Sequence, residues 1–299
     1  MAVTAVAAPF GQSSGAPARG ALTAQALLDR IKATIGVAWK TDSVDGFTAG
    51  DPATTVAGIV TTALPTIAVL RQAVAAGANV VIAAQPTFYA RTDARRPSPG
   101  PTASPRTAPP GPTPTVDPVV AAKREYVDRH GLVVMRLSDH WRARESDPMA
   151  TAFGASMGWS RHQAAGDPRR YDVPAMSLET LVAAVGRALR TDGGIRVVGE
   201  PSMRLRTIGL LPGSTPIQAA LAMLPTVDAI VAGEVREWET VEYVRDQVAS
   251  GAAKALVLVG RVVSEEPGMN ACAEWLKTVA PGVAVTHVPA GDPYWRPAP

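Results

Sequence analysis

Short apolar runs alternate with amphipathic helical segments along most of the chain, and this alternation limits the folds that the chain can adopt. The apolar runs are residues 54–64, 79–84, 132–137, 195–198, 204–211, 229–232, 255–259 and 283–288. Apolar residues recur at helical spacing in residues 23–36, 65–77, 119–130, 147–158, 177–193, 237–249 and 266–279. β-branched side chains fit the pleated surface of a strand, and strands that are apolar on both faces lie between helices. The sequence therefore predicts an α/β fold.

The composition indicates a folded protein and argues against several classes of partner. Of the 299 residues, 46% are hydrophobic and 18% are charged, which is enough for one large core or two smaller ones. The net charge is only +3 and the basic residues are scattered, so we expect no nucleic-acid partner. No apolar stretch reaches the roughly 18 residues of a spanning helix, so we expect no membrane partner. The single cysteine, Cys272, allows neither an intramolecular disulfide nor a cysteine-based zinc site.

The sequence predicts two lobes and two further segments of unusual composition. Residues 1–20 are rich in alanine, glycine, serine and proline and predict a disordered leader, with a shortened export signal as the rival interpretation. We expect residues 21–172 to form a first α/β lobe and residues 173–299 to form a second. Residues 95–118 contain nine prolines and predict a flexible surface insertion in the first lobe. We expect a cytoplasmic protein, or an exported one if the leader is a truncated signal.

Residues 154–158 match the Gly-x-Ser-x-Gly pattern of a serine nucleophile, with Ser156 at the centre. That pattern needs a strand before it and a helix after it. Here a helical segment precedes the pattern and a loop follows it. Small residues at a helix end are therefore the favoured interpretation, and an esterase is a distant alternative. The sequence also lacks a phosphate-binding loop and a Gly-x-Gly-x-x-Gly motif.

Polar residues follow several of the predicted strands. Asp139 and His140 lie one residue beyond the strand at 132–137, and Glu234 and Glu265 follow the strands at 229–232 and 255–259. Functional groups in α/β proteins gather at the carboxyl ends of strands, so the two glutamates could face a shared pocket. The simpler alternative is that each glutamate stabilises the positive end of a helix dipole.

Several segments in a fixed order resemble a known family. These segments are residues 45–52, 86–89, 139–141, 232–239 and 262–269. Together they resemble the Nif-three-like dinuclear metal centre hexameric protein family, some members of which are classed as type 2 GTP cyclohydrolase I. The resemblance extends from about residue 21 to residue 295. It implies two similar α/β lobes, a metal pair in the cleft between them, and a toroidal homohexamer.

The chain departs from the family at the positions that would bind metal. The family has histidines where this chain has Ala84, Ser138, Arg142 and Arg261, and an acidic residue where this chain has Gln85. Alanine offers no lone pair, and arginine stays protonated and has no acceptor. The resemblance therefore implies a metal site that has lost most of its ligands.

Three residues would remain from such a metal site, namely Asp139, His140 and Glu265. A divalent pair needs several nitrogen and oxygen donors that converge within about 2.0–2.6 Å, and three are too few for two tightly held ions. We expect no full metal pair. A single weakly bound divalent ion (Zn, Fe or Mn) on this remnant stays open as the alternative.

Two functions follow from the resemblance and its departures. In the first, Arg142 and Arg261 replace the metal ions, neutralise Asp139 and Glu265, and bind a small anionic ligand beside Gln85 and Glu234. The protein would then be non-catalytic or weakly active, or an oligomeric scaffold. In the second, the protein is a metal-dependent hydrolase resembling type 2 GTP cyclohydrolase I, with a weak metal site that activates water. Whether the chain is an enzyme stays open on the sequence.

Overall fold

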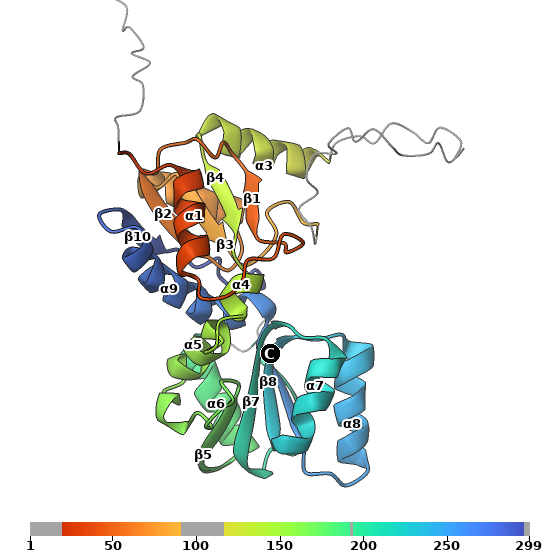
Figure 1. Ribbon diagram of the computed structural model, residues 1–299. Coiled ribbons are helices and arrows are strands. Elements are labelled where there is room, and N and C mark those ends of the chain that lie inside the picture. The colour runs from red at the N-terminus through yellow and green to blue at the C-terminus, as the bar shows by residue number, and fades with distance from the viewer. Residues whose placement is uncertain (1–19, 91–116, 192–193, 296–299) are drawn as a thin grey trace, which may run out of the picture.

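The computed structural model describes residues 20–90, 117–191 and 194–295, and the strands in this part of the chain form two separate sheets. Each sheet has five strands, in the orders β1-β4-β3-β2-β10 and β5-β7-β8-β9-β6. Figure 1 shows one sheet in each of two lobes, with one long helix lying between the lobes. The predicted α/β class with two lobes is confirmed. The predicted leader and nearly all of the proline-rich insertion lie outside the described residues.

The first sheet is mostly parallel. Its strands are β1 (Gly46–Ala49), β2 (Gly58–Thr62), β3 (Val80–Ala83), β4 (Val133–Arg136) and β10 (Ala284–His287). Its helices are α1 (Ala24–Thr34), α2 (Ile67–Ala75) and α3 (Pro118–Arg129). Strands β10, β2, β3 and β4 run parallel, and β1 pairs antiparallel at the edge. The carboxyl ends of β3 and β4 therefore lie side by side, which brings Gln85 and Ser138 to one edge of the sheet.

The second sheet has a parallel centre and two antiparallel edges. Its strands are β5 (Arg170–Ser177), β6 (Arg196–Val198), β7 (Arg204–Ser214), β8 (Ala229–Glu234) and β9 (Ala255–Leu258). Its helices are α6 (Leu178–Leu189), α7 (Ile217–Met223), the π-helical turn η3 (Glu237–Val241) and α8 (Glu242–Ala249). Two 3-10 turns, η1 (Ser160–His162) and η2 (Leu224–Thr226), complete it. Strands β7, β8 and β9 run parallel, so their carboxyl ends share one edge.

Helix α9 (Arg261–Val279) joins the two lobes. It contacts strands β2 and β10 of the first sheet and strands β7 and β8 of the second. It also packs on α5 (Pro148–Ser156), which follows the short helix α4 (Asp139–Arg142) in the connection between the lobes. Met269, Cys272 and Leu276 of α9 are buried in the core of the first lobe. The predicted helix at 266–279 begins five residues too late, because Pro267 lies inside α9 and does not begin it.

The division into lobes differs from the predicted boundary at residue 172. Strand β5 begins before that boundary and belongs to the second sheet. Strand β10 lies far beyond the boundary, yet it pairs with β2 of the first sheet. The second lobe is therefore inserted between β4 and β10 of the first lobe. No helix in residues 20–90, 117–191 and 194–295 is long and apolar enough to cross a membrane.

The contact between α5 and α9 depends on a glycine. A Cβ atom on Gly268 would lie 2.1 Å from the sulfur and 2.9 Å from the Cα atom of Met149. We expect Gly268→Ala to lower the free energy of unfolding by about 1–3 kcal/mol, because the helices must separate. Gly186→Ala in α6 is the matched control, since its Cβ would meet its nearest atom at an ordinary 3.5 Å. That change should stabilise the helix. Urea unfolding of both variants measures the difference, and equal effects would contradict the prediction.

Candidate functional site

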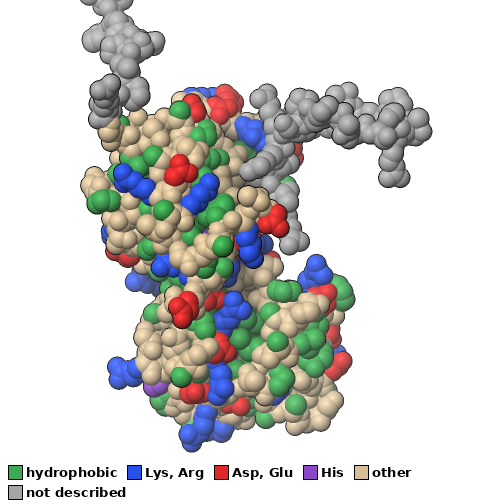
Figure 2. Space-filling view, viewed as in Figure 1, with side chains coloured by type: hydrophobic (Ala, Val, Ile, Leu, Met, Phe, Trp, Pro, Cys, Tyr) green, Lys and Arg blue, Asp and Glu red, His purple; other side chains and the backbone are tan. Residues whose placement is uncertain are grey.

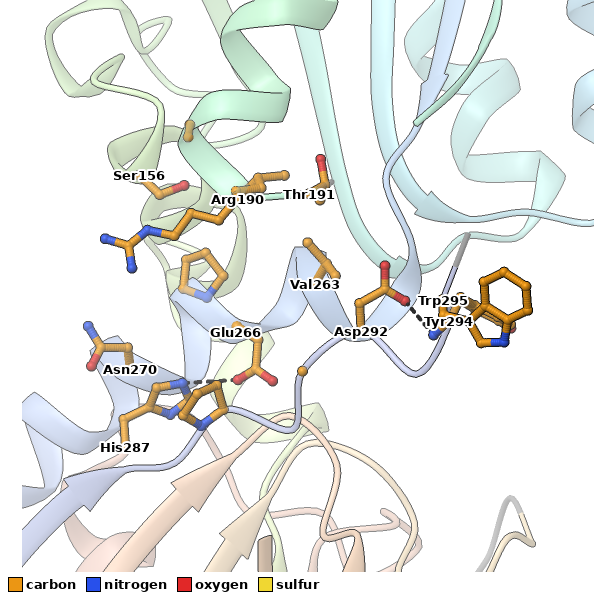
Figure 3. Close-up of a pocket in the computed structure, with 15 residues that line it drawn as sticks. Ser156, Arg190, Thr191, Val263, Glu266, Asn270, His287, Asp292, Tyr294 and Trp295 are labelled. Carbon is orange, nitrogen blue, oxygen red and sulfur yellow. Dashed lines mark hydrogen bonds and ion pairs between the residues drawn. The ribbon is translucent and has the colours of Figure 1, made fainter. Parts of the chain in front are cut away.

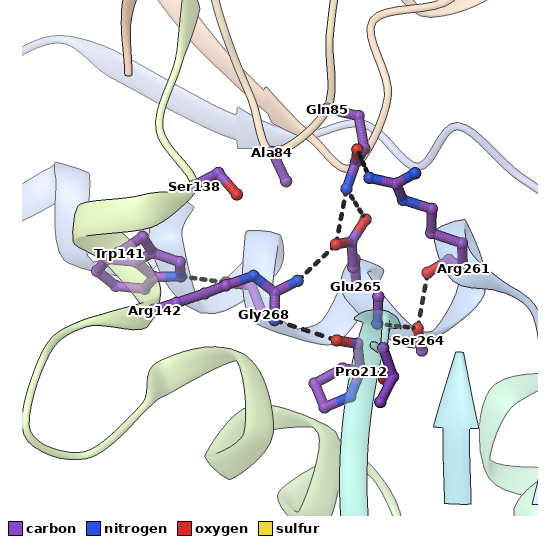
Figure 4. A network of polar contacts seen from close by, with 12 residues as sticks. Ala84, Gln85, Ser138, Trp141, Arg142, Pro212, Arg261, Ser264, Glu265 and Gly268 are labelled. Atoms are coloured by element: carbon purple, nitrogen blue, oxygen red, sulfur yellow. Dashed lines mark hydrogen bonds and ion pairs between the residues drawn. The ribbon is translucent and has the colours of Figure 1, made fainter. Parts of the chain in front are cut away.

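Polar side chains from both lobes meet around the first turns of α9. Gln85 follows β3, Arg142 ends α4, Glu234 ends β8, and Arg261 and Glu265 lie one turn apart on α9. Figure 4 shows Gln85, Arg142 and Arg261 around Glu265, with Ala84 and Ser138 beside them. Because the carboxyl ends of parallel strands point to this position in both lobes, residues far apart in the sequence come together here.

The carboxyl group of Glu265 lies at the centre and is 1% exposed. The amide nitrogen of Gln85 donates to both of its oxygens, at 2.7 and 2.6 Å. The Nη2 atom of Arg142 donates to Oε1 at 2.5 Å. Burial raises the pKa of Glu265 above its ordinary value, although Arg142, Gln85 and Arg261 favour the charged form.

Arg142 links Glu265 to the second lobe through hydrogen bonds. Its Nη1 atom donates to the backbone oxygen of Pro212, at 3.1 Å, within β7. The next residue, Gly213, has a φ of 86°, and a Cβ atom there would lie 2.5 Å from Glu265 Oε1 and 2.7 Å from Arg142 Nη2. The absence of a side chain at Gly213 therefore makes room for the ion pair. Its backbone N–H also donates to Ser264 Oγ of α9, at 2.8 Å.

Arg261 extends the network in the other direction. Its Nη2 atom donates to the side-chain oxygen of Gln85. Its Nη1 atom lies 3.4 Å from Glu234 Oε1. The amide of Gln85 thus accepts from a guanidinium and donates to a carboxylate. The contacts form a continuous chain in the order Arg142, Glu265, Gln85, Arg261 and Glu234, in which two positive and two negative groups balance.

The structure places His140 away from this network. Its Nδ1 atom lies 2.7 Å from Asp45 Oδ2, and its Nε2 atom accepts the backbone N–H of Lys40 at 2.8 Å. The ring also stacks on Trp39, with the ring centroids 3.8 Å apart. Both ring nitrogens are therefore in use, and His140 stabilises the first lobe instead of offering a lone pair to the site.

Asp139 also points elsewhere. Its carboxylate accepts from Ser43 Oγ at 3.0 Å and from the backbone N–H of Val44 at 3.4 Å. The prediction that an arginine neutralises Asp139 does not hold, because Arg142 pairs with Glu265. Asp139 and Arg142 lie at opposite ends of a four-residue helix, and only Arg142 turns towards Glu265.

These contacts do not fit a divalent metal pair. Of the three predicted remnant ligands, only Glu265 lies in the network, and its oxygens already accept from Gln85 and Arg142. Among the described residues, no group of three or more His, Cys, Asp and Glu side chains could hold a metal ion. The chemistry that the arrangement supports is the neutralisation of a buried carboxyl group by guanidinium and amide groups of the protein.

Sequence reasoning missed three contributors to this region. Asp45 accepts the backbone N–H groups of Ser138 and His140, at 2.7 and 2.9 Å, and so fixes the turn after β4. Gly213 and Ser264 set the approach of β7 to α9. The Pro-Gly-Ser sequence that follows an apolar run is typical of a turn, and this pattern could have identified Gly213. The partners of Asp45 are about ninety residues away, so no local pattern marks them.

The raised pKa of Glu265 predicts a dependence of stability on pH. The folded state holds this proton more tightly than the unfolded chain does, so stability falls as the pH rises from the ordinary glutamate pKa through the raised one. Glu265→Gln removes the titration, and we expect the variant to lack this decline. Glu274→Gln, at an exposed position on the same helix, is the control and should follow the wild type. Urea unfolding across this pH range is the measurement, and parallel curves for wild type and Glu265→Gln would contradict the prediction.

Comparison with known proteins gives a match in structure. No protein-family model matches the chain, and no curated protein matches its sequence. The NIF3-related protein of Bacillus cereus superposes with a TM-score of 0.68 at 12% identity, over 92% of this chain and 99% of that one. Protein SA1388 of Staphylococcus aureus gives 0.67 at 13% identity, with the same coverage of 92% and 99%. The protein ybgI, of unknown function, gives 0.68 at 19% identity, over 91% and 100%.

At these identities the likeness establishes the fold, and it extends over nearly the whole of each chain. The predicted resemblance is confirmed at that level. This chain has the two-lobed α/β fold of the NIF3-related proteins.

Proposed function

We propose that this chain is a NIF3-type protein in which charged groups of the protein replace the metal pair, so that it is a non-catalytic scaffold and not a hydrolase. The observation that carries this proposal is the set of contacts around Glu265. Its two oxygens accept three hydrogen bonds from Gln85 and Arg142 while the side chain is 1% exposed. These three contacts use three of the roughly four lone pairs of the carboxylate, so little of Glu265 is left to coordinate a divalent ion.

The network also holds the lobes in one arrangement. Gln85 comes from the first sheet, Pro212 and Glu234 come from the second, and Glu265 lies on the helix between them. Loss of one partner would leave a buried charge uncompensated, which typically costs about 3–5 kcal/mol. Cleft motions that many enzymes use would break these contacts. A fixed arrangement of lobes favours a structural role.

Self-association is part of the proposal, as the homohexamer that the family resemblance implies. Several large aromatic side chains are exposed, among them Trp238 at 72%, Tyr294 at 74% and Trp295 at 83%. Figure 2 shows apolar side chains gathered on the surface of the second lobe. Exposed aromatic residues are enriched where protein surfaces meet, so they favour an assembled state.

Binding of a small anion is a second candidate function, and it is favoured by a cavity beside Arg261. This cavity of about 610 Å³ is lined by Arg196, Arg261, Glu234 and the backbone at Gly260, where α9 begins without a side-chain cap. Free N–H groups at a helix N-terminus and guanidinium groups both attract anions. Arg142 does not line this cavity, so the anion would depend on Arg261.

A metal-uptake experiment tests the first proposal. We expect purified wild-type protein to carry no stoichiometric zinc, iron or manganese. A variant with Ala84→His, Gln85→Glu, Ser138→His, Arg142→His and Arg261→His should gain near-stoichiometric metal, because it restores donors around Glu265 and removes two positive charges. The control carries Ala84→His and Ser138→His alone and should stay without metal, because both arginines remain.

Metal content by mass spectrometry and the folded state by circular dichroism give the result. Tightly held metal in the wild-type protein would contradict the scaffold proposal and favour the metal-dependent hydrolase. A folded five-site variant that takes up no metal would contradict the correspondence between these residues and the family's ligands.

A phosphate titration tests the second candidate. We expect inorganic phosphate to bind saturably, and Arg261→Gln to weaken binding about tenfold or more, because a charge-assisted hydrogen bond contributes about 1.5–3 kcal/mol. Arg245→Gln is the control, since Arg245 lies on α8 in an exposed pair with Glu242. Calorimetry gives the dissociation constants. Equal affinity in wild type and Arg261→Gln would rule out this anion site.

A further inference from the structure

Residues 291–295, which we call the strap, lie beside the cavity in which Arg261 would bind an anion. Asp292 and Tyr294 of the strap line this cavity of about 610 Å³. The same two residues and Val263 of α9 also line a cavity of about 790 Å³, so the two cavities are neighbours. The strap is therefore part of the wall of both cavities, and its position decides how far each one is open.

The chain is anchored just before the strap begins. The backbone N–H of Ala290 donates to Oε1 of Glu266 on α9, at 2.7 Å. Oε2 of Glu266 lies 2.9 Å from Nε2 of His287, at the end of β10. Figure 3 shows the chain running from His287 past Glu266 to Asp292. Glu266 thus fixes the point from which the strap leaves the first sheet.

Beyond this anchor the strap buries little of its surface. All five of its residues are exposed, and Tyr294 and Trp295 are 74% and 83% exposed. Pro293 has no backbone N–H and so cannot donate a hydrogen bond to the surface beneath it. Segments with few buried contacts open at a low cost in free energy. The strap is therefore a part of the structure that can move without unfolding either lobe.

Gly291 separates the anchored part of the chain from the rest of the strap. Its φ is 76°, in the left-handed region that glycine adopts without strain. A Cβ atom at this position would meet nothing within 4 Å, so packing does not hold the residue in place. Hinges are a few residues at the ends of elements that absorb changes in φ and ψ. Gly291 has the position and the conformational freedom of such a hinge.

Asp292 brings a negative charge to the cavity beside Arg261. Its Oδ1 atom accepts the backbone N–H of Tyr294 at 3.0 Å, which keeps this part of the strap folded. The cavity also contains Glu234, whose Oε1 atom lies 3.4 Å from Nη1 of Arg261. Charges of the same sign repel each other. A second carboxylate in the wall therefore opposes the binding of an anion while the strap is in this position.

We propose that the strap is an autoinhibitory element that regulates the anion site beside Arg261. In the position seen here, Asp292 disfavours the anion. Rotation at Gly291 withdraws Asp292 and joins the two cavities. This inference rests on the proposed anion site and adds its regulation. Because the anion binds better to the withdrawn state, it shifts the equilibrium of the strap towards that state.

Phosphate titration of the full chain by calorimetry tests the effect on affinity. We expect Asp292→Asn to bind inorganic phosphate about threefold more tightly than the wild type, or better, because the repulsion is removed. Gly291→Ala should also bind more tightly, because alanine disfavours the left-handed conformation of the strap as it stands. Gly282→Ala is the matched control and should bind as the wild type does. Its φ is 84° and its Cβ would also meet nothing within 4 Å, but it lies before β10.

The titration distinguishes failure of the strap from failure of the anion site. Wild-type affinity in both Asp292→Asn and Gly291→Ala, with weaker binding in Arg261→Gln, would overturn the strap proposal and leave the anion site in place. Absence of phosphate binding in the wild type and in every variant would rule out the anion site, and the strap proposal with it.

A distance measurement tests whether the strap moves. Spin labels on Trp295→Cys and Arg245→Cys join the strap to an exposed position on α8, and the native Cys272 is buried and stays unlabelled. We expect phosphate to add a second population of distances in pulsed electron paramagnetic resonance, with the labelled chain diluted in unlabelled protein. The control pair, Glu274→Cys and Arg245→Cys, joins exposed positions on α9 and α8 outside the strap and should keep one distance.

Two results of the distance measurement would overturn the proposal. The first is an unchanged distance for the strap pair at phosphate concentrations that saturate the calorimetric binding, because Asp292 would then stay in the cavity wall. The second is an equal change in both pairs, because the lobes would then move and not the strap.

Discussion

The buried carboxyl group of Glu265 is the constraint on which the arrangement of the two lobes depends. A carboxylate at 1% exposure needs partners, and here they come from opposite sides: an amide from the first lobe and a guanidinium that is itself anchored to the second. Desolvation still raises the pKa of the group, so the network limits the penalty of burial without removing it. Polar networks of this type specify one geometry because each member has a single satisfactory set of partners.

The faces of helix α9 differ in chemistry. Arg261 and Glu265 point to the network, whereas Pro267 and Asn270 line a cavity of about 790 Å³. Pro267 cannot donate a hydrogen bond to the carbonyl of Val263, so this face of the helix keeps an acceptor without its usual partner. The tight packing of Gly268 on Met149 fixes the rotation of the helix, and this rotation decides which residues face each site.

The sequence predicted the central strands and most helices, because β2, β3, β4, β8 and β9 are short apolar runs buried on both faces. It did not predict β1 and β5, which are edge strands with mixed burial and no continuous apolar pattern. Within the site, Gln85, Glu265, Arg142, Arg261 and Glu234 do come together. Asp139 and His140 do not, because their partners lie about a hundred residues earlier in the chain and leave no local pattern. Spacing along the sequence therefore identified the side chains at strand ends but not the direction in which each one points.

The return of the chain to the first sheet has a consequence for the order of folding. The second sheet uses only residues between 170 and 258, whereas the first sheet needs β10 at 284–287 as its fifth strand. During synthesis from the N-terminus, the second sheet therefore has all its strands while the first still lacks one. The first sheet must therefore wait until β10 emerges, well after β4, before it is complete.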